Sequence, residues 1–203
     1  MSVYIIDYGM GNILSVKRAF EKCNSDIYIA NDPNDLYNAT HIILPGVGAF
    51  NDGMKNLREK NWINILNELV IDKKIPILGI CLGMQLLSDV GYEMGVTNGL
   101  GYINGNVIPM IPQKEERIPH VGWNEISIKN DNEIINGIND NTDFYFVHSY
   151  HFKVDDETNI IATTDYASGI VSIVNKDNIY GTQFHPEKSQ KAGFKVIKNF
   201  LAL

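Results

Sequence analysis

A cysteine between two glycines is the feature of this sequence that most clearly points to chemistry. Cys81 lies in the order Gly79-Ile-Cys81-Leu82-Gly83, after an apolar run and before a helix-prone segment. A sharp strand-to-helix turn exposes a nucleophile in this way, and the two glycines leave room for the turn. The turn also aims the positive end of a helix at the sulfur and lets the Leu82 N–H bind an oxyanion. A buried core cysteine is the alternative, and the glycines alone leave both interpretations open.

A histidine and a glutamate further along the chain could serve such a nucleophile. His185-Pro186-Glu187 follows an apolar, strand-like run. A thiol nucleophile needs a base, and the base needs a group that orients it. Pro186 ends the strand, and Glu187 can point to the same side as His185. The spacing therefore predicts Cys81 as nucleophile, His185 as base and then acid, and Glu187 as its orienting group. Taken alone, the tripeptide is more typical of an ordinary surface turn.

Other reactive residues give weaker signals. Cys23 lies on a helical pattern without a glycine turn, and we interpret it as a packing residue. No histidine and cysteine pair has the spacing of a metal site, so no metal is expected. The run Leu44-Pro45-Gly46-Val47-Gly48 ends a strand in a glycine-flanked turn. Such a turn can offer backbone N–H groups to an anion, although it also fits an ordinary strand-to-helix connection.

Alternating strand-like and helix-like runs must position these residues. In the first half we expect strands at residues 3–7, 26–30, 41–44 and 75–80, and helices at 13–23, 52–58, 62–72 and 82–90. This alternation is typical of a parallel sheet with helices on both faces. The second half has strand-like runs at 126–129, 144–148, 160–164, 170–174 and 179–184, and a last helix at 190–201. It predicts an antiparallel or mixed region attached to the parallel core.

The composition limits the possible classes of protein. A chain of 203 residues fits one domain, and we expect a single α/β domain over residues 1–203. The 17 basic and 24 acidic side chains give a net charge of −7, which argues against nucleic acid as a partner. No apolar run of 18 residues predicts a membrane span, and the first residues resemble a strand more than a signal peptide. Two separated cysteines suggest a reduced, cytoplasmic protein.

The motifs and their order resemble the triad-type, class I glutamine amidotransferases. Members of that family share a Gly-x-Cys-x-Gly turn, an upstream Pro-Gly turn and a downstream His-Pro-Glu. Within the family, the sequence is most similar to the glutaminase subunit of imidazole glycerol phosphate synthase. The resemblance runs through residues 7–12, 44–50, 79–87, 99–101, 119–124, 144–150 and 183–189. It implies a flavodoxin-like α/β fold, with a mostly parallel central sheet flanked by helices and an additional antiparallel or mixed region.

The resemblance also implies a role for each matched position. Cys81 would attack the carboxamide of L-glutamine to form a thioester, His185 would protonate the departing ammonia and then activate water, and Glu187 would orient His185. The remaining matched positions fall into three groups: an oxyanion hole from Val47, Gly48 and Leu82, a glutamine site from Gly46, Gln85, Val147, His148 and Ser149, and a partner-facing set of Asn12, Trp123 and Lys188.

The partner implied by the resemblance is a (β/α)₈-barrel cyclase subunit, which forms a heterodimer with the glutaminase. Ammonia would pass through the barrel to a ribonucleotide and yield imidazole glycerol phosphate and an aminoimidazole carboxamide ribotide in histidine biosynthesis. A closed interface makes physical sense, because ammonia released into water is protonated and lost. The resemblance implies no cofactor.

The sequence departs from the pattern of this branch in three places. Val121 replaces an expected methionine, residues 168–171 are atypical, and His151 stands where an aromatic residue is common. None of them touches the expected triad, but they leave the partner open. A paralogous glutaminase that supplies ammonia for amidation of a surface-glycan sugar is one alternative. A non-catalytic interaction subunit and a stand-alone cysteine hydrolase are two others.

Overall fold

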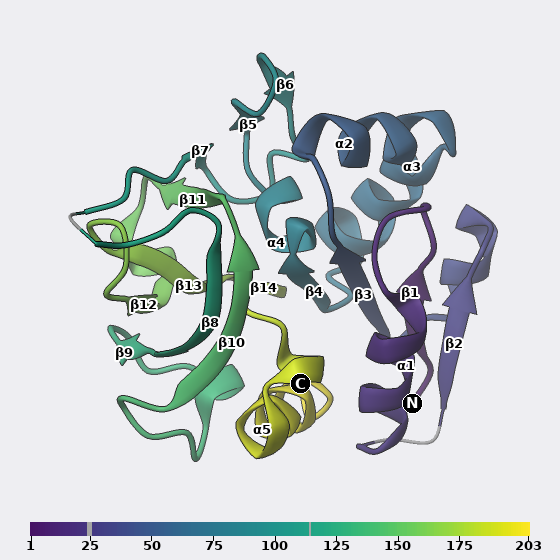
Figure 1. Cartoon of the computed structure of the whole chain (residues 1–203). Coiled ribbons are helices and arrows are strands. Elements are labelled where there is room, and N and C mark those ends of the chain that lie inside the picture. Colours follow the sequence, from purple (N-terminus) through teal and green to yellow (C-terminus); the bar gives the residue numbers. More distant parts are fainter. Residues whose placement is uncertain (24–25, 114) are drawn as a thin grey trace.

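The computed structural model describes residues 1–23, 26–113 and 115–203. An eight-stranded sheet in the order β2-β1-β3-β4-β14-β13-β12-β9 forms its centre (Figure 1). The parallel part consists of β1 (Val3–Ile6), β2 (Ile27–Ala30), β3 (His41–Gly46), β4 (Ile77–Cys81) and β14 (Ile179–Thr182). The antiparallel part consists of β13 (Ile170–Lys176), β12 (Ile160–Thr164) and β9 (Ser127–Ile128). The expected α/β fold with a mostly parallel sheet and an attached antiparallel region is confirmed.

Two smaller sheets lie beside the antiparallel part (Figure 1). One pairs β8 (His120–Glu125) with β10 (Asp143–His148) in antiparallel register. The other has the order β11-β7-β5-β6 and contains β5 (Val90–Gly91), β6 (Thr97–Asn98), β7 (Gly105–Pro109) and β11 (Tyr150–Val154). Strands β5 to β8 and β11 were not predicted from the sequence, and the strand expected at 126–129 is reduced to the two residues of β9.

Helices cover both faces of the central sheet (Figure 1). The α-helices are α1 (Ile13–Glu21), α2 (Phe50–Glu59), α3 (Trp62–Leu66), α4 (Leu82–Leu86) and α5 (Gln190–Phe200). A π-helical segment, η2 (Asn67–Asp72), continues α3 and completes the helix expected at 62–72. Short 3₁₀ helices are η1 (Pro33–Asn38), η3 (Glu133–Ile135), η4 (Glu157–Asn159) and η5 (Pro186–Lys188).

The helix expected at 82–90 is wrong in its length, because α4 ends at Leu86. The carbonyl groups of Leu86 and Leu87 accept hydrogen bonds from the backbone N–H groups of Leu100 and Tyr102. These long-range bonds take acceptors that a longer helix would have used within itself. The chain therefore turns away after one and a half turns and enters β5.

Alternation along the strands divides the buried apolar residues between two cores. In β3, Ile42 and Leu44 belong to the core under α2 and α3, whereas Ile43 belongs to the core under α1 and α5. Successive side chains of a strand point to opposite faces, so a strand covered on both faces must be apolar throughout. The apolar residues 42–44 of β3 therefore follow from its position in the sheet.

The parallel strands deliver the candidate chemical groups to one edge of the sheet. Gly46 at the end of β3 is paired with Cys81 at the end of β4. Strand β14 is paired with β4 up to Thr182, and His185 follows three residues later. Carboxyl ends of parallel strands form the usual ligand-binding edge of an open α/β sheet. Among the described residues, no helix is long and apolar enough to cross a membrane.

Candidate active site

The glycine-flanked turn at Cys81 has the geometry that its spacing predicts. Cys81 adopts φ 54° and ψ −109°, a conformation that L-residues rarely hold. A Cβ atom at Gly79 would lie 2.6 Å from the Gly83 carbonyl oxygen. A Cβ atom at Gly83 would lie 1.7 Å from the Leu44 carbonyl oxygen. Both glycines are therefore required by close backbone packing, and that packing holds the strained turn in place.

The helix that follows the nucleophile is shorter than expected. Helix α4 has five residues, so it cannot supply the dipole of a long helix to the sulfur. Its first backbone N–H groups, beginning with Leu82, still have no acceptor within the helix. The expected contribution of the turn to oxyanion binding therefore depends on individual N–H groups near Cys81.

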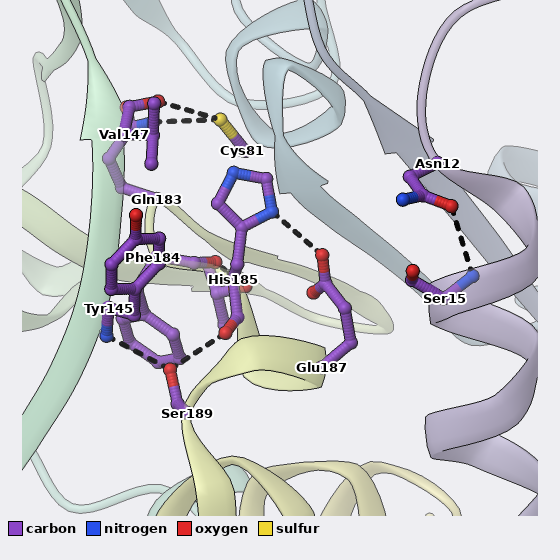
Figure 2. Close-up of polar contacts among 11 residues, drawn as sticks. Asn12, Ser15, Cys81, Tyr145, Val147, Gln183, Phe184, His185, Glu187 and Ser189 are labelled. Atoms are coloured by element: carbon purple, nitrogen blue, oxygen red, sulfur yellow. Dashed lines mark hydrogen bonds and ion pairs between the residues drawn. The ribbon is translucent and has the colours of Figure 1, made fainter. Parts of the chain in front are cut away.

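His185 stands between Cys81 and Glu187, as Figure 2 shows. Its Nδ1 atom lies 2.8 Å from Oε1 of Glu187, and both side chains are only 3% exposed. The Ser189 hydroxyl donates to the His185 carbonyl at 2.7 Å and accepts from the Tyr145 N–H at 3.0 Å. The His185 N–H donates to the Tyr145 carbonyl at 2.9 Å. The turn that carries the histidine is thus tied to β10 by backbone and hydroxyl hydrogen bonds.

The surroundings of His185 favour its charged form. Burial by itself lowers the pKa of His185, but hydrogen bonds to Cys81 and Glu187, together with their negative charges, raise it to about 10. The ordinary pKa of histidine is near 6.5. The imidazole therefore carries a proton at neutral pH while it faces the sulfur on one side and a carboxylate on the other.

Two further groups touch the sulfur of Cys81, whose residue is 5% exposed. The thiol lies 3.6 Å from the Val147 carbonyl oxygen, and the Gln183 side-chain nitrogen lies 3.8 Å from the sulfur (Figure 2). Val147 was expected near the substrate, whereas Gln183 was not given a role from the sequence. Its position two residues before His185 on the same strand end is the signal that could have found it.

A cavity of 260 Å³ opens above Cys81, and its size suits a small polar metabolite. Most of the expected site residues line it together: Val47, Gly48, Cys81, Leu82, Gln85, Val147, His148, Ser149, His185 and Lys188. Gly46 lies behind this wall, where a Cβ atom would come 2.4 Å from the Tyr8 hydroxyl. Glu187 lies behind His185. The structure therefore brings the expected catalytic, oxyanion and glutamine residues to one place.

The cavity also contains residues that sequence reasoning missed. Glu93, between β5 and β6, lines it and accepts a hydrogen bond from the Phe50 N–H at 2.8 Å. Pro119 and Tyr150 complete the wall. No local motif marks Glu93, because its segment joins two strands that were not predicted. Gln85 was expected to bind the substrate, but its amide nitrogen is already used within the protein. It donates to the Tyr150 carbonyl at 2.9 Å and to the Gln183 side chain at 3.0 Å.

Two of the three residues expected to face a partner lie together, and the third lies elsewhere. Asn12 caps α1, and its side chain accepts from the Ser15 N–H at 3.2 Å (Figure 2). Trp123, on β8, is 44% exposed and makes an edge contact with Tyr145. The Lys188 ammonium lies over the same Tyr145 ring, 5.7 Å from its centre, and Lys188 also lines the cavity. Trp123 and Lys188 therefore meet at one tyrosine, whereas Asn12 lies on another element.

The donor set does not suggest a metal centre. Within residues 1–23, 26–113 and 115–203, no group of three or more His, Cys, Asp and Glu side chains could hold a metal ion. A larger hollow of 510 Å³ lies beside Lys129, Glu157 and Ile160, away from the nucleophile. Its wall contains no cysteine or histidine, so the cavity at Cys81 is the better candidate for the active site.

Comparison with known proteins identifies the family. The glutamine amidotransferase class-I family matches residues 4–203. The chain is a class-I glutamine amidotransferase. The amidotransferase is 48% identical to the imidazole glycerol phosphate synthase subunit HisH 1 of Campylobacter jejuni, over 99% of this chain and 100% of the relative. It is 47% identical to the subunit HisH 2 of Methanococcus maripaludis, over 98% of each chain. These relatives place the amidotransferase in the HisH branch of its family.

Solved structures support the fold of the amidotransferase independently of sequence. A crystal structure titled glutamine amidotransferase covers 100% of this chain with a TM-score of 0.78 at 16% identity. The structure of PurLQS from Thermotoga maritima covers 99% with a TM-score of 0.75 at 18% identity. At such low identity the similarity concerns the fold alone.

Proposed function

We propose that this amidotransferase is the glutaminase subunit of imidazole glycerol phosphate synthase. It hydrolyses L-glutamine and passes ammonia to a cyclase subunit, which forms imidazole glycerol phosphate and an aminoimidazole carboxamide ribotide in histidine biosynthesis. The observation that carries the proposal is the line of Cys81, His185 and Glu187 at the floor of the cavity. The HisH relatives, which match over nearly their whole length, support the choice of substrate and pathway.

The geometry supports a two-step hydrolysis. In the first step the sulfur of Cys81, whose proton has passed to His185, attacks the glutamine carboxamide carbon. The C–N bond breaks, His185 gives its proton to the departing nitrogen, and ammonia leaves a glutamyl thioester behind. In the second step neutral His185 takes a proton from water, and the resulting hydroxide attacks the thioester and releases glutamate. Glu187 keeps the imidazole oriented and stabilises its charged form throughout.

Backbone N–H groups stabilise the tetrahedral intermediates in this proposal. Leu82 supplies one N–H from the start of α4, and the Val47–Gly48 segment supplies the other. Gly48 has φ 114°, a value that glycine adopts without strain, and Val47 is 45% exposed. A peptide rotation in this segment therefore meets little steric resistance, and it would complete the oxyanion hole when the partner is active.

The charges of the cavity match a zwitterionic amino acid. Glu93 and Lys188 are the acidic and the basic side chain in its wall besides the catalytic histidine. We assign the Glu93 carboxylate to the α-ammonium group of glutamine and the Lys188 ammonium to the α-carboxylate. Val147, His148 and Ser149 contribute the surrounding wall, and Gly46 supports it from behind. Gln85 keeps its side-chain oxygen for the substrate, because its amide nitrogen makes two internal bonds.

The partner in this proposal is a (β/α)₈-barrel cyclase, which forms a heterodimer with the amidotransferase over the edge that carries the cavity. Exposed Val121 and Trp123 on β8 provide apolar contact area for it, and Asn12 and Lys188 provide polar contacts. Both cysteines are free thiols, which supports a cytoplasmic location. A surface-sugar acceptor is not favoured, because the relatives carry the name of imidazole glycerol phosphate synthase.

The test is glutamate release by the amidotransferase mixed with a barrel cyclase and the cyclase ligand. We expect turnover that requires both proteins and produces imidazole glycerol phosphate from the ribonucleotide. The Cys81→Ala variant should bind the cyclase but release no glutamate. Equal turnover by Cys81→Ala and wild type would refute the catalytic assignment. Glutamate release without turnover of the ribonucleotide would refute the pathway and point to another ammonia acceptor.

A further inference from the structure

A row of hydrogen-bonded groups links strand β8 to the active-site cysteine. The part of this row nearest to β8 has no role in the mechanism proposed above. His120 on β8 and His148 on β10 are directly opposite each other in the antiparallel ladder. The Asn124 amide nitrogen lies 2.6 Å from Nε2 of His120. Nδ1 of His120 lies 2.9 Å from Nε2 of His148. Nδ1 of His148 lies 2.8 Å from the Tyr150 carbonyl oxygen.

The same carbonyl oxygen connects this row to the nucleophile. The Gln85 amide nitrogen donates to the Tyr150 backbone carbonyl at 2.9 Å and to the Gln183 side-chain oxygen at 3.0 Å. The Gln183 amide nitrogen then lies 3.8 Å from the sulfur of Cys81. Six contacts therefore run without interruption from Asn124 to Cys81. The two glutamines and the two histidines are all buried.

Only one arrangement of protons satisfies the whole row. The Tyr150 carbonyl can only accept, so His148 must carry its proton on Nδ1 and accept at Nε2. His120 must then donate from Nδ1 and accept the Asn124 amide at Nε2. This requires both rings to be neutral. Burial lowers the pKa of His148 to about 3 and, against a smaller effect of Glu116, that of His120 to about 4.

The rings are also fixed from their faces. The His120 ring stacks on Tyr166 with 3.9 Å between centres and on Phe146 with 4.8 Å. These stacks alone would be enough for a histidine that only fills space between β8 and β10. The directed hydrogen bonds of His120 go beyond that structural role. The bonds place the Tyr150 carbonyl, and that carbonyl fixes one of the two bonds made by Gln85.

We propose that His120 and His148 are positioning residues for the nucleophile. They hold the Tyr150 carbonyl so that Gln85 stays bonded to Gln183 and the Gln183 amide stays directed toward Cys81. Asn124 is the end of the row that a partner on β8 can reach. The proposal rests on the glutaminase function proposed above. It concerns how the sulfur is positioned, and no proton moves along the row during the reaction.

The first test uses substitutions at the two histidines in the complex with the cyclase. His120→Phe keeps a stacking ring and removes both hydrogen bonds, so we expect kcat to fall by about tenfold with less than a threefold change in the KM for glutamine. His148→Asn keeps a donor near Nδ1 and loses only the contact with His120, so its loss should be about threefold. His151→Phe is the control, because this half-buried histidine is outside the row, and its kcat should stay within about twofold of wild type.

The second test does not depend on turnover. Nitrogen-proton correlation spectra of wild-type histidines should show His120 and His148 as neutral Nδ1–H tautomers at pH 7. The rate at which iodoacetamide alkylates Cys81 should change in His120→Phe and stay unchanged in His151→Phe. If the wild-type complex releases no glutamate, the proposed function fails, but the spectra and the alkylation rates still decide the positioning role.

Two results would overturn the proposal. One is an Nε2–H tautomer at either histidine. The other is a His120→Phe protein that keeps the kcat and alkylation rate of the control, even if its unfolding midpoint drops, because that would show a purely structural role. If His120→Phe does not fold, the tautomers of the wild-type histidines and the kcat of His148→Asn still test the positioning role.

Discussion

The turn that carries Cys81 and the turn that carries His185 are held by different forces. At Cys81 the backbone is forced into φ 54° by close packing, and Gly83 has no room for a single added carbon beside the Leu44 carbonyl. At His185 the backbone is ordinary, and its position is set by a hydrogen bond from Ser189 and by hydrogen bonds that His185 donates to Tyr145 and Glu187. Steric packing tolerates no small change, whereas a set of hydrogen bonds can lose one member and keep most of its geometry. The two halves of the site should therefore fail in different ways.

The largest effect is expected from Gly83→Ala. The new Cβ atom would lie 1.7 Å from a backbone oxygen of β3, so β3 and α4 would have to separate. We expect a loss of more than about 4 kcal/mol in the free energy of unfolding, measured by urea denaturation. Gly95→Ala is the control, because its Cβ atom meets open space and only the φ of 114° adds strain, worth about 1–2 kcal/mol. Similar losses in the two variants would contradict the packing explanation.

At the His185 turn, Glu187→Gln should impair the orientation of the imidazole without disrupting the fold. The amide keeps the shape of the side chain but cannot stabilise a protonated His185, so kcat should fall by about 100-fold or more while the fold remains. Glutamate release in the cyclase complex measures the effect. Glu157→Gln, an exposed change on η4, serves as a control and should leave kcat unchanged. A decrease of less than threefold in Glu187→Gln would mean that the carboxylate does not orient the base.

The buried histidines should respond to pH in opposite directions. His185 has a raised pKa, so its stabilising effect is complete below pH 6.5 and is lost as pH rises toward 10. His120 and His148 have lowered pKa values, so they destabilise the fold as pH falls below 6.5. Between pH 7 and 5 the free energy of unfolding should therefore decrease, by about 2 kcal/mol per histidine at most. Urea denaturation across this range should show a smaller decrease for His148→Asn than for wild type, and an equal decrease would contradict the pKa assignment.

Ser189→Ala should have the smallest effect. It removes the hydroxyl that joins the His185 carbonyl to the Tyr145 N–H, and the other bonds at this turn remain. We expect a loss of about 1–3 kcal/mol in unfolding free energy and a decrease in kcat of only a few fold. Ser168→Ala, which removes an exposed hydroxyl, should cost less than about 0.5 kcal/mol. A collapse of activity in Ser189→Ala would show that the His185 turn is as intolerant as the Cys81 turn.

The sequence by itself determined the parts of the molecule whose signals are local. Glycines at 79 and 83 marked the nucleophile turn because close backbone approach excludes any other residue there. The alternation of strand-like and helix-like runs marked a parallel sheet with helices on both faces. His-Pro-Glu marked the base and its orienting group, which are neighbours in the chain. The family could be inferred from these motifs and their order.

The tertiary structure decided the features that depend on distant partners. Helix α4 stops at Leu86 because Leu100 and Tyr102 occupy its last carbonyl groups. Glu93 reaches the cavity from a segment without a recognisable pattern. His120 and His148 meet because of the β8–β10 register, which no local motif encodes. Hydrogen bonds between remote segments depend on where the whole chain places them, whereas steric requirements of the backbone are visible in the residue types themselves.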